Sequence, residues 1–409
     1  MTKKSDAPAI RFKGFSDAWE QRKLGDVVQI TMGQSPDGST YSDEPSDYIL
    51  VQGNADLQNG WVCPRIWTTQ ITKKADAGDL IMSVRAPAGA MGKTAYNAVI
   101  GRGVAAIKGN EFIYQLLVKM DMDGFWKTLS CGSTFESLNS DNIKNAEVKV
   151  PTTAEQVQIG DFFRHLDNLI TLHQRKFEKL TNVKKSMLEK MFPQNGSSYP
   201  EIRFKGFTDP WEQRKLGELV DRVVRKNTNN ESTLPLTISA QYGLVDQITY
   251  FNNRVASRDV SNYYLVLNGE FAYNKSTSDG YPFGAVKRLD LYEKGVLSTL
   301  YIVFTPKKEQ QIDSDFLTVF FDTDRWHKGV AERAAEGARN HGLLNISAED
   351  FFDIDLSVPK DIVEQKQIGA FIRQLDNLIT LHQRKGKAAV SGCFLNCSSI
   401  EKVRRKAEL

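Results

Sequence analysis

The sequence predicts an α/β protein with an internal duplication, in which two different domains are each enclosed by the same pair of flanking segments. Two repeats predict the duplication. An opening motif at residues 11–25 returns at residues 203–217, and a segment at residues 155–176 returns at residues 364–385 with four substitutions. The residues between the shared segments do not resemble each other. The period is close to the size of a domain, so the chain is a duplication with two diverged domains and not a solenoid of short repeats.

The spacing of the shared segments differs between the two ends of the repeat. The opening motif recurs after 192 residues and the closing segment after 209, a difference of 17 (209 minus 192). The second copy therefore carries the longer insert. We call the opening motif and the closing segment of each copy its frame.

The closing segment of the first copy predicts one long helix. Between Gln156 and Met191 there is no proline and a single glycine, so a helix of about 36 residues is allowed. Apolar residues recur in steps of four and three, which is the spacing of a coiled-coil seam. A stripe of this length has to be buried against another helix. The seam residues of the first copy are Leu166, Ile170, His173, Phe177 and Leu180.

The second copy supplies a partner helix in the same phase, through Leu375, Ile379 and His382. Beyond Lys385 the chain no longer matches the first copy. Its tail contains serine and glycine, which are poor residues for a helix interior. We therefore expect the seam to end at Lys385.

The composition does not identify the binding partner of the protein. The chain has 409 residues with 53 basic and 50 acidic side chains, a formal net charge of +3. Nucleic-acid binding needs a local basic surface and not a basic total, so this balance neither requires nor excludes it.

Cysteine usage and hydropathy exclude several classes of protein. The cysteines, Cys63, Cys131, Cys393 and Cys397, are too few and scattered for a disulfide framework. Cys393 and Cys397 have no second ligand pair nearby, so we predict no metal site. The sequence has neither an apolar signal segment at its start nor a run long enough to span a membrane, which predicts a cytoplasmic protein.

The repeated motifs resemble those of a known family. Phe-x-Gly-Phe-x-x-x-Trp-Glu-x-x-x-Leu-Gly, present twice, and Glu-Gln-x-x-Ile followed by Leu-Asp-x-Leu-Ile-x-x-His-Gln-x-Lys, also present twice, resemble the two halves of specificity subunits of type I restriction–modification enzymes. The resemblance extends from Arg11 to Lys385, and motif, order, duplication and spacing agree.

The resemblance implies an α/β fold with two target-recognition domains, separated by two long antiparallel helices in a pseudo-twofold arrangement. Each domain is expected to recognise one half of a split DNA target. The implied segments are a first recognition domain at 1–150, a central helix and linker at 151–200, a second recognition domain at 201–358, and a C-terminal helix with an atypical tail at 359–409.

The resemblance also implies partners. They are double-stranded DNA, two methyltransferase subunits that use S-adenosylmethionine, and restriction subunits that use ATP and magnesium. Those cofactors belong to the partners, so we expect this chain to bind none and to catalyse nothing. In agreement with this expectation, the sequence contains no Asn-Pro-Pro-Tyr or Asp-Pro-Pro-Tyr methyltransferase motif and no adequate glycine-rich cofactor loop.

Polar loops and cations are the candidate DNA contacts, because arginine and lysine pair with guanine or phosphate while amides and hydroxyls hydrogen-bond to base edges. Residues 79–89 predict a strand that runs into a turn, with Arg85 presented at its end. The first-half candidates are Gln34, Ser35, Arg85, Lys93, Arg102, Ser133 and Thr134. The second-half candidates are Asn274, Lys275, Ser276, Lys287, Arg288, Arg339 and Asn340.

One alternative function fits the same repeats. The duplicated helices could dock protein partners in a scaffold whose variable domains bind protein and not DNA. Binding to specific duplexes that weakens as salt is raised would distinguish DNA recognition from this alternative.

Overall fold

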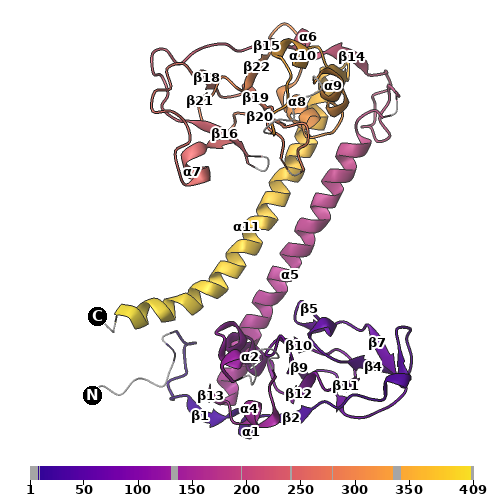
Figure 1. Cartoon of the computed structure of the whole chain (residues 1–409), viewed down its shortest axis with the longest axis vertical. Coiled ribbons are helices and arrows are strands. Elements are labelled where there is room, and N and C mark those ends of the chain that lie inside the picture. Colours follow the sequence, from indigo (N-terminus) through magenta and orange to yellow (C-terminus); the bar gives the residue numbers. More distant parts are fainter. Residues whose placement is uncertain are drawn as a thin grey trace. The chain divides into compact units, whose positions relative to one another are not determined.

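The structure, a computed structural model, describes residues 8, 10–129, 137–194, 196–239, 242–278, 280–334 and 342–406, with side chains as far as residue 388. The chain divides into a first unit, residues 1–172 with 385–409, and a second unit, residues 173–384. The boundary between them falls within the two long helices, α5 (Thr153–Lys190) and α11 (Ile362–Lys406) (Figure 1). Each unit is described separately.

The first unit is built mainly from short strands with helices after them. Its helices are α1 (Leu24–Val27), α2 (Glu111–Met122), α3 (Phe125–Leu129) and α4 (Ser140–Lys144), with 3-10 turns η1 (Gly38–Thr40) and η2 (Asn54–Asp56). Its strands are β1 (Glu20–Lys23), β2 (Gln29–Met32), β3 (Tyr41–Ser42), β4 (Tyr48–Val51), β5 (Leu57–Gln58), β6 (Trp61–Val62), β7 (Ile66–Thr68), β8 (Lys74–Ala75), β9 (Leu80–Ser83), β10 (Met91–Lys93), β11 (Ala98–Ile100), β12 (Val104–Lys108) and β13 (Glu147–Val150).

Two larger sheets, the two-stranded sheet β1-β13 and a helical layer make up the first unit. One sheet has the order β2-β12-β9-β10-β6-β5 and the other β3-β7-β4-β11-β8. Side chains alternate along a strand, so each strand can serve two cores. In β12, Val104 and Ala106 pack toward the second sheet, whereas Ala105 and Ile107 pack with Trp126 in the helical layer. The central sheet is therefore buried on both faces.

The second unit has the same kinds of element. Its helices are α6 (Leu216–Leu219), α7 (Gln247–Phe251), α8 (Ser314–Phe321), α9 (His327–Arg333) and α10 (Ala348–Phe352). Its strands are β14 (Glu212–Lys215), β15 (Val220–Arg222), β16 (Leu236–Ser239), β17 (Gly243–Asp246), β18 (Tyr264–Leu267), β19 (Phe271–Asn274), β20 (Ala285–Arg288), β21 (Lys294–Leu297), β22 (Ile302–Pro306) and β23 (Asp355–Val358).

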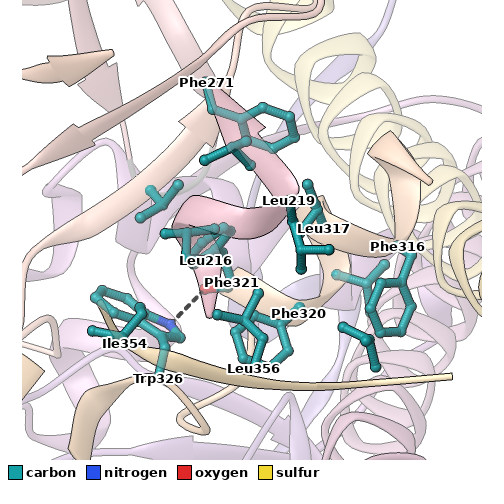
Figure 2. Close-up of a cluster of buried hydrophobic side chains, with 14 of the residues drawn as sticks. Leu216, Leu219, Phe271, Phe316, Leu317, Phe320, Phe321, Trp326, Ile354 and Leu356 are labelled. Carbon is teal, nitrogen blue, oxygen red and sulfur yellow. Dashed lines mark hydrogen bonds between the residues drawn. The ribbon is translucent and has the colours of Figure 1, made fainter. Parts of the chain in front are cut away.

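An aromatic core fills the helical side of the second unit. The central sheet has the order β15-β22-β19-β20. Phe271 and Phe304 stack with ring centroids 5.3 Å apart on one face of this sheet. Figure 2 shows Phe271 in one buried cluster with Trp326 and the side chains of α8, and the Trp326 indole N–H donates to the Phe321 carbonyl at 3.2 Å. The opposite face packs Ala272 against the strands β16, β18 and β21.

The frame closes each unit in the same way. The opening motif forms β1, which pairs antiparallel with β13, and Glu20 lies opposite Val150. In the second copy β14 pairs with β23, and Glu212 lies opposite Val358 in the same register. The strand at each opening therefore lies beside the strand that leads into the long helix.

A buried ion pair fastens each opening motif to its helix. Arg11 donates two hydrogen bonds to Glu155, at 2.6 and 2.7 Å, and Arg203 does the same to Glu364, at 2.7 and 2.8 Å. The glutamate side chains are 0% and 1% exposed. Bidentate geometry of this kind compensates the loss of hydration that a buried carboxylate suffers.

The two long helices meet inside the second unit. His173 Nδ1 lies 2.9 Å from His382 Nδ1, and farther along α5 the ammonium of Lys184 lies 2.7 Å from Asp376 Oδ1. Rising numbers on α5 match falling numbers on α11, so these portions are antiparallel. Each seam residue of both copies is buried or half-buried.

The tail after Lys385 does not end the second long helix. The backbone of α11 remains helical to Lys406, well beyond Lys385. No proline follows residue 359, so nothing removes a backbone donor, and serine and glycine lower the helix propensity without ending the helix.

Lys184 also joins the helix pair to the globular part of the second unit. Its ammonium lies 3.2 Å from Asp322 Oδ2, and Lys287 lies 2.7 Å from the other oxygen of that carboxylate. Burial alone would raise the pKa of Asp322, but Lys287 and Lys184 outweigh burial and hold it below its ordinary value. Because the folded state then binds fewer protons than the unfolded state, this network stabilises the fold at neutral pH and is lost on acidification.

We predict that Arg203→Met lowers the free energy of unfolding by about 3 kcal/mol, because Glu364 would remain buried without its cation. Chemical denaturation followed by tryptophan fluorescence measures this loss. The double variant Arg203→Met/Glu364→Gln should recover part of the stability, since it removes the unpaired charge. An unchanged midpoint in the single variant would contradict the role given to the pair.

We predict that Lys184→Met lowers the free energy of unfolding at pH 7 by about 2 kcal/mol, because Asp322 and Asp376 lose a shared cation. The loss of stability below about pH 4, where the carboxylates take up protons, should also become shallower. Denaturation curves between pH 7 and pH 3 measure both effects. The exposed neighbour provides the control, and Lys185→Met should leave the curves unchanged.

Candidate nucleic-acid interface

The central sheets of the two units share one strand order. In the first unit β2, β12, β9 and β10 are neighbours in that order, and in the second β15, β22, β19 and β20 are, with every adjacent pair antiparallel. A glycine with positive φ, Gly78 or Gly269, precedes an acidic residue and then β9 or β19. When β9 and β19 are compared with these glycines as the common reference, Arg85 and Ser276 occupy equivalent positions.

The loop after β2 lies against the turn before β12. The Gln34 backbone N–H donates to the Ile100 carbonyl at 2.9 Å, and the Arg102 backbone N–H donates to the Ser35 hydroxyl at 3.1 Å. Hydrogen bonds therefore bring together candidates that lie 67 residues apart in the sequence.

Arg85 belongs to the same edge of the sheet. The residue before it, Val84, donates its backbone N–H to the Gly103 carbonyl at 2.9 Å, directly beside Arg102. Gln34, Arg85 and Arg102 are exposed. Within the part of the chain that the structure describes, neither arginine side chain makes a hydrogen bond or ion pair. We call Gln34, Ser35, Arg85 and Arg102 the first edge.

Close backbone approach at the first edge requires glycine. A Cβ atom on Gly33 would lie 2.1 Å from the Gly101 carbonyl oxygen, and one on Gly103 would lie 2.0 Å from the Gln52 carbonyl oxygen. A side chain at Gly33 would push the loop of Gln34 and Ser35 away from the turn that carries Arg102, and one at Gly103 would push that turn away from Gln52.

The second unit places Asn274, Lys275 and Ser276 at the matching edge. The Asn274 side-chain oxygen accepts from the Ser276 backbone N–H at 3.0 Å, and the Lys275 ammonium donates to the Ile346 carbonyl at 3.3 Å. Ser276 is exposed, while the other two are half-buried. We call these three residues the second edge. It presents an amide, a hydroxyl and one partly engaged cation where the first edge presents free arginines.

Lys93 lies at the end of β10 that is farther from the first edge, and its side chain has partners within the first unit. Its ammonium lies 3.0 and 3.1 Å from the Glu111 carboxylate oxygens and over the ring of Tyr114, 4.3 Å from the centroid. Burial raises the pKa of the Tyr114 phenol to about 12. Arg288 occupies the matching position on β20, is buried, and pairs with Asp290 and Asp315 at 2.7 and 2.8 Å.

Lys287 is also neutralised internally, through Asp322. The three cations on β10 and β20 fix strands to neighbouring segments of their own unit, so we leave Lys93, Lys287 and Arg288 out of the contacts proposed below. The remaining candidates, Ser133, Thr134, Arg339 and Asn340, lie outside the described residues.

The long helices carry a second surface that is the same in both copies. Leu169 and Leu172 on α5 are exposed, and so are Leu378 and Leu381, their matches 209 residues later on α11. These leucines lie beside the half-buried seam. Intrachain packing therefore does not account for their identity in the two copies.

The described residues contain neither a candidate metal site nor a candidate membrane span. Among them, no group of three or more histidine, cysteine, aspartate or glutamate side chains is placed to hold a metal ion. No helix in that part of the chain combines the length and apolar character that crossing a membrane requires.

Comparison with known proteins identifies the family. The profile of the type I restriction modification DNA specificity domain matches residues 16–182 and again residues 208–390, which together make up most of the chain. The chain belongs to this family. The two matches coincide with the two copies of the duplication, so each copy is one specificity domain.

Relatives of the specificity domain family agree with the assignment. The chain is 29% identical over 180 residues to the putative type I restriction enzyme MjaX specificity subunit of Methanocaldococcus jannaschii, covering 42% of this chain and 41% of that protein. It is 24% identical over 233 residues to the MjaIX specificity subunit of the same organism, covering 49% and 51%. The chain thus matches about half or less of the length of these relatives.

A solved structure has a similar fold. The S subunit of a type I restriction-modification system from M. genitalium superimposes with a TM-score of 0.62 over 97% of this chain and 98% of that one, at 12% identity. The likeness supports the mixed α/β fold with two specificity domains and long helices.

Two of the features described above were not predicted from the sequence. The exposed leucines could have been identified from the sequence, because they are identical in both copies but lie beside the seam and not within it. The close approach of Gly33 and Gly103 to neighbouring backbones carries no such signal, since it depends on strand order.

Proposed function

We propose that this chain is the sequence-specific DNA-recognition subunit of a type I restriction–modification complex, in which each specificity domain recognises one half of a bipartite target. One observation carries the proposal. Matching edges of two equivalent sheets present different polar groups, Arg85 in the first unit and Ser276 in the second. A split target with unlike halves needs two readers that share a scaffold and differ in their contacts.

The chemistry of the edges suits base recognition in the major groove. A free arginine can donate two hydrogen bonds to guanine, and a glutamine or asparagine amide can pair with adenine. We assign Arg85, Arg102 and Gln34 to the first half-site, and Asn274, Lys275 and Ser276 to the second. None of these contacts needs a nucleophile, so we propose that the chain is not itself catalytic.

In this proposal residues 1–150 and 201–358 are the recognition domains, and residues 151–200 and 359–409 hold the spacer helices. Half-sites on one face of B-DNA recur about every 34 Å. A 38-residue helix such as α5 rises about 57 Å along its axis, which is long enough to set such a spacing.

The partners follow from the repeated helix surface. Two equivalent surfaces fit two copies of one partner in a pseudo-twofold arrangement. We assign Leu169 with Leu172, and Leu378 with Leu381, to two methyltransferase subunits that bind S-adenosylmethionine. Restriction subunits that use ATP and magnesium complete the proposed assembly, and this chain binds none of these cofactors.

We predict that Arg85→Ala and Arg102→Ala each weaken binding to the specific duplex about tenfold or more, because each removes guanidinium hydrogen bonds to a base edge or phosphate. The target is first identified by methylome sequencing of cells that express the complex. Fluorescence anisotropy of the purified complex on that duplex then measures the affinity at two salt concentrations.

Arg22→Ala is the matched control for these variants, because Arg22 is an exposed arginine on β1, away from the first edge. It should bind like the unmodified complex. If the edge variants keep full affinity, the first edge is not the contact. If the unmodified complex binds all duplexes equally, or binds none, the scaffold alternative is favoured.

We predict that Leu378→Glu/Leu381→Glu removes one of the two methyltransferase subunits, since two carboxylates would enter an apolar contact. Leu169→Glu/Leu172→Glu should remove the other. Native mass spectrometry counts the subunits in each purified complex. Lys185→Glu, an exposed change on α5 outside the repeated surface, should retain both, and two retained subunits in the leucine variants would contradict the assignment.

A further inference from the structure

The second unit carries an apolar projection that its own fold does not use. Helix α7 contributes no buried residue to any core. Tyr250 is 49% exposed, Phe251 is 51% exposed, and Val255 in the following loop is 67% exposed. Single exposed apolar side chains are ordinary, but a cluster within a few residues indicates a surface that a partner covers. We call residues 247–258 the α7 knob (Figure 1).

The knob is held in one shape by polar contacts at its base. The Asp246 carboxylate caps α7 by accepting from the Ile248 backbone N–H at 2.9 Å, and the hydrogen bond from Thr249 lowers the pKa of that carboxyl. The Gln247 side-chain oxygen accepts from the Ala256 backbone N–H at 2.6 Å, which folds the loop back onto the helix. A surface with so little freedom to lose can bind without a large ordering cost.

The polar groups of the knob indicate the kind of partner. From residue 247 to residue 258 the sequence contains two arginines, two asparagines and no carboxylate. Arg254 is used internally, since its guanidinium donates to the Ala256 and Ser257 carbonyls. Arg258 is exposed, and no hydrogen bond or ion pair engages its side chain among the described residues. Asn252 and Asn253 in the same segment are also exposed.

We propose that the α7 knob is a second DNA contact of the second specificity domain, which inserts Tyr250 and Phe251 against bases while Arg258 pairs with phosphate. Proteins that bind the minor groove of DNA insert apolar side chains between bases and use arginine and asparagine beside them. Residues 247–258 themselves place no carboxylate against the phosphate backbone, while Asp246 caps α7 and Asp259 follows Arg258. The inference rests on the proposed function and adds to it a determinant of the second half-site.

The knob has no equivalent in the other copy. Between β2 and β9 the first unit, described there without a gap, forms two 3-10 turns and no α-helix. The knob should therefore affect recognition of one half-site only. A general loss of folding or of assembly would not produce such a one-sided effect.

The test uses the complete complex with its methyltransferase partners and two duplexes. One duplex carries both half-sites identified by methylome sequencing, and the other has the half assigned to the second domain scrambled. In Tyr250→Ala/Phe251→Ala the affinity ratio between the two duplexes should fall about tenfold, while affinity for the scrambled duplex stays as in the unmodified complex. Arg258→Ala removes a phosphate contact, so it should weaken binding to both duplexes by a similar factor.

Val363→Ala is the matched control, since Val363 is another apolar residue of the second unit that is half exposed. Thermal unfolding confirms that all variants fold. An unchanged affinity ratio in Tyr250→Ala/Phe251→Ala overturns the inference, and so does an altered subunit count with that ratio intact, which would make the knob a protein contact. Unchanged affinity of Arg258→Ala for both duplexes overturns the phosphate contact. If the unmodified complex itself does not distinguish the duplexes, the proposed function fails.

Discussion

A bidentate ion pair between an arginine of the opening motif and a glutamate of the closing helix is the constraint on which each specificity domain depends. The carboxylates of Glu155 and Glu364 are almost fully removed from water, so they are tolerable only while Arg11 and Arg203 face them. The same pair fixes where the chain enters and leaves each domain. With both ends fixed, the residues between them can vary without moving the helix.

The two copies do not use their helices identically. Lys184 ties α5 to Asp376 of α11 and to Asp322, whereas the residue that matches Lys184 in the second copy is Cys393. The match of Asp376 is Asp167, whose pKa is raised by burial even though Gln115 donates to it at 2.8 Å. The sequence thus supplies the ammonium of this network in one copy only. The two copies have therefore kept the same frame but differ in the charged residues of their long helices.

The frame could be predicted from the sequence because the same contacts constrain it twice, which keeps residues such as Arg11 and Arg203 identical. The shared strand order could not, since many apolar residues satisfy the alternation along a buried strand. Proximity at the first edge arises from contacts such as the backbone hydrogen bond from Gln34 to Ile100, which does not depend on the identity of either side chain. The sequence shows that Lys93 is a cation, but only the folded structure shows that Glu111 is its partner.

The contact between His173 and His382 has an evolutionary consequence. These residues are counterparts in the two copies, and counterparts touch each other only where a local twofold axis passes between them. Elsewhere a residue of one copy faces a residue of the other that is not its counterpart, as Lys184 faces Asp376. Here a substitution in one copy immediately changes the surroundings of its twin. The imidazole pair therefore couples the histories of two halves that are otherwise free to acquire unrelated specificities.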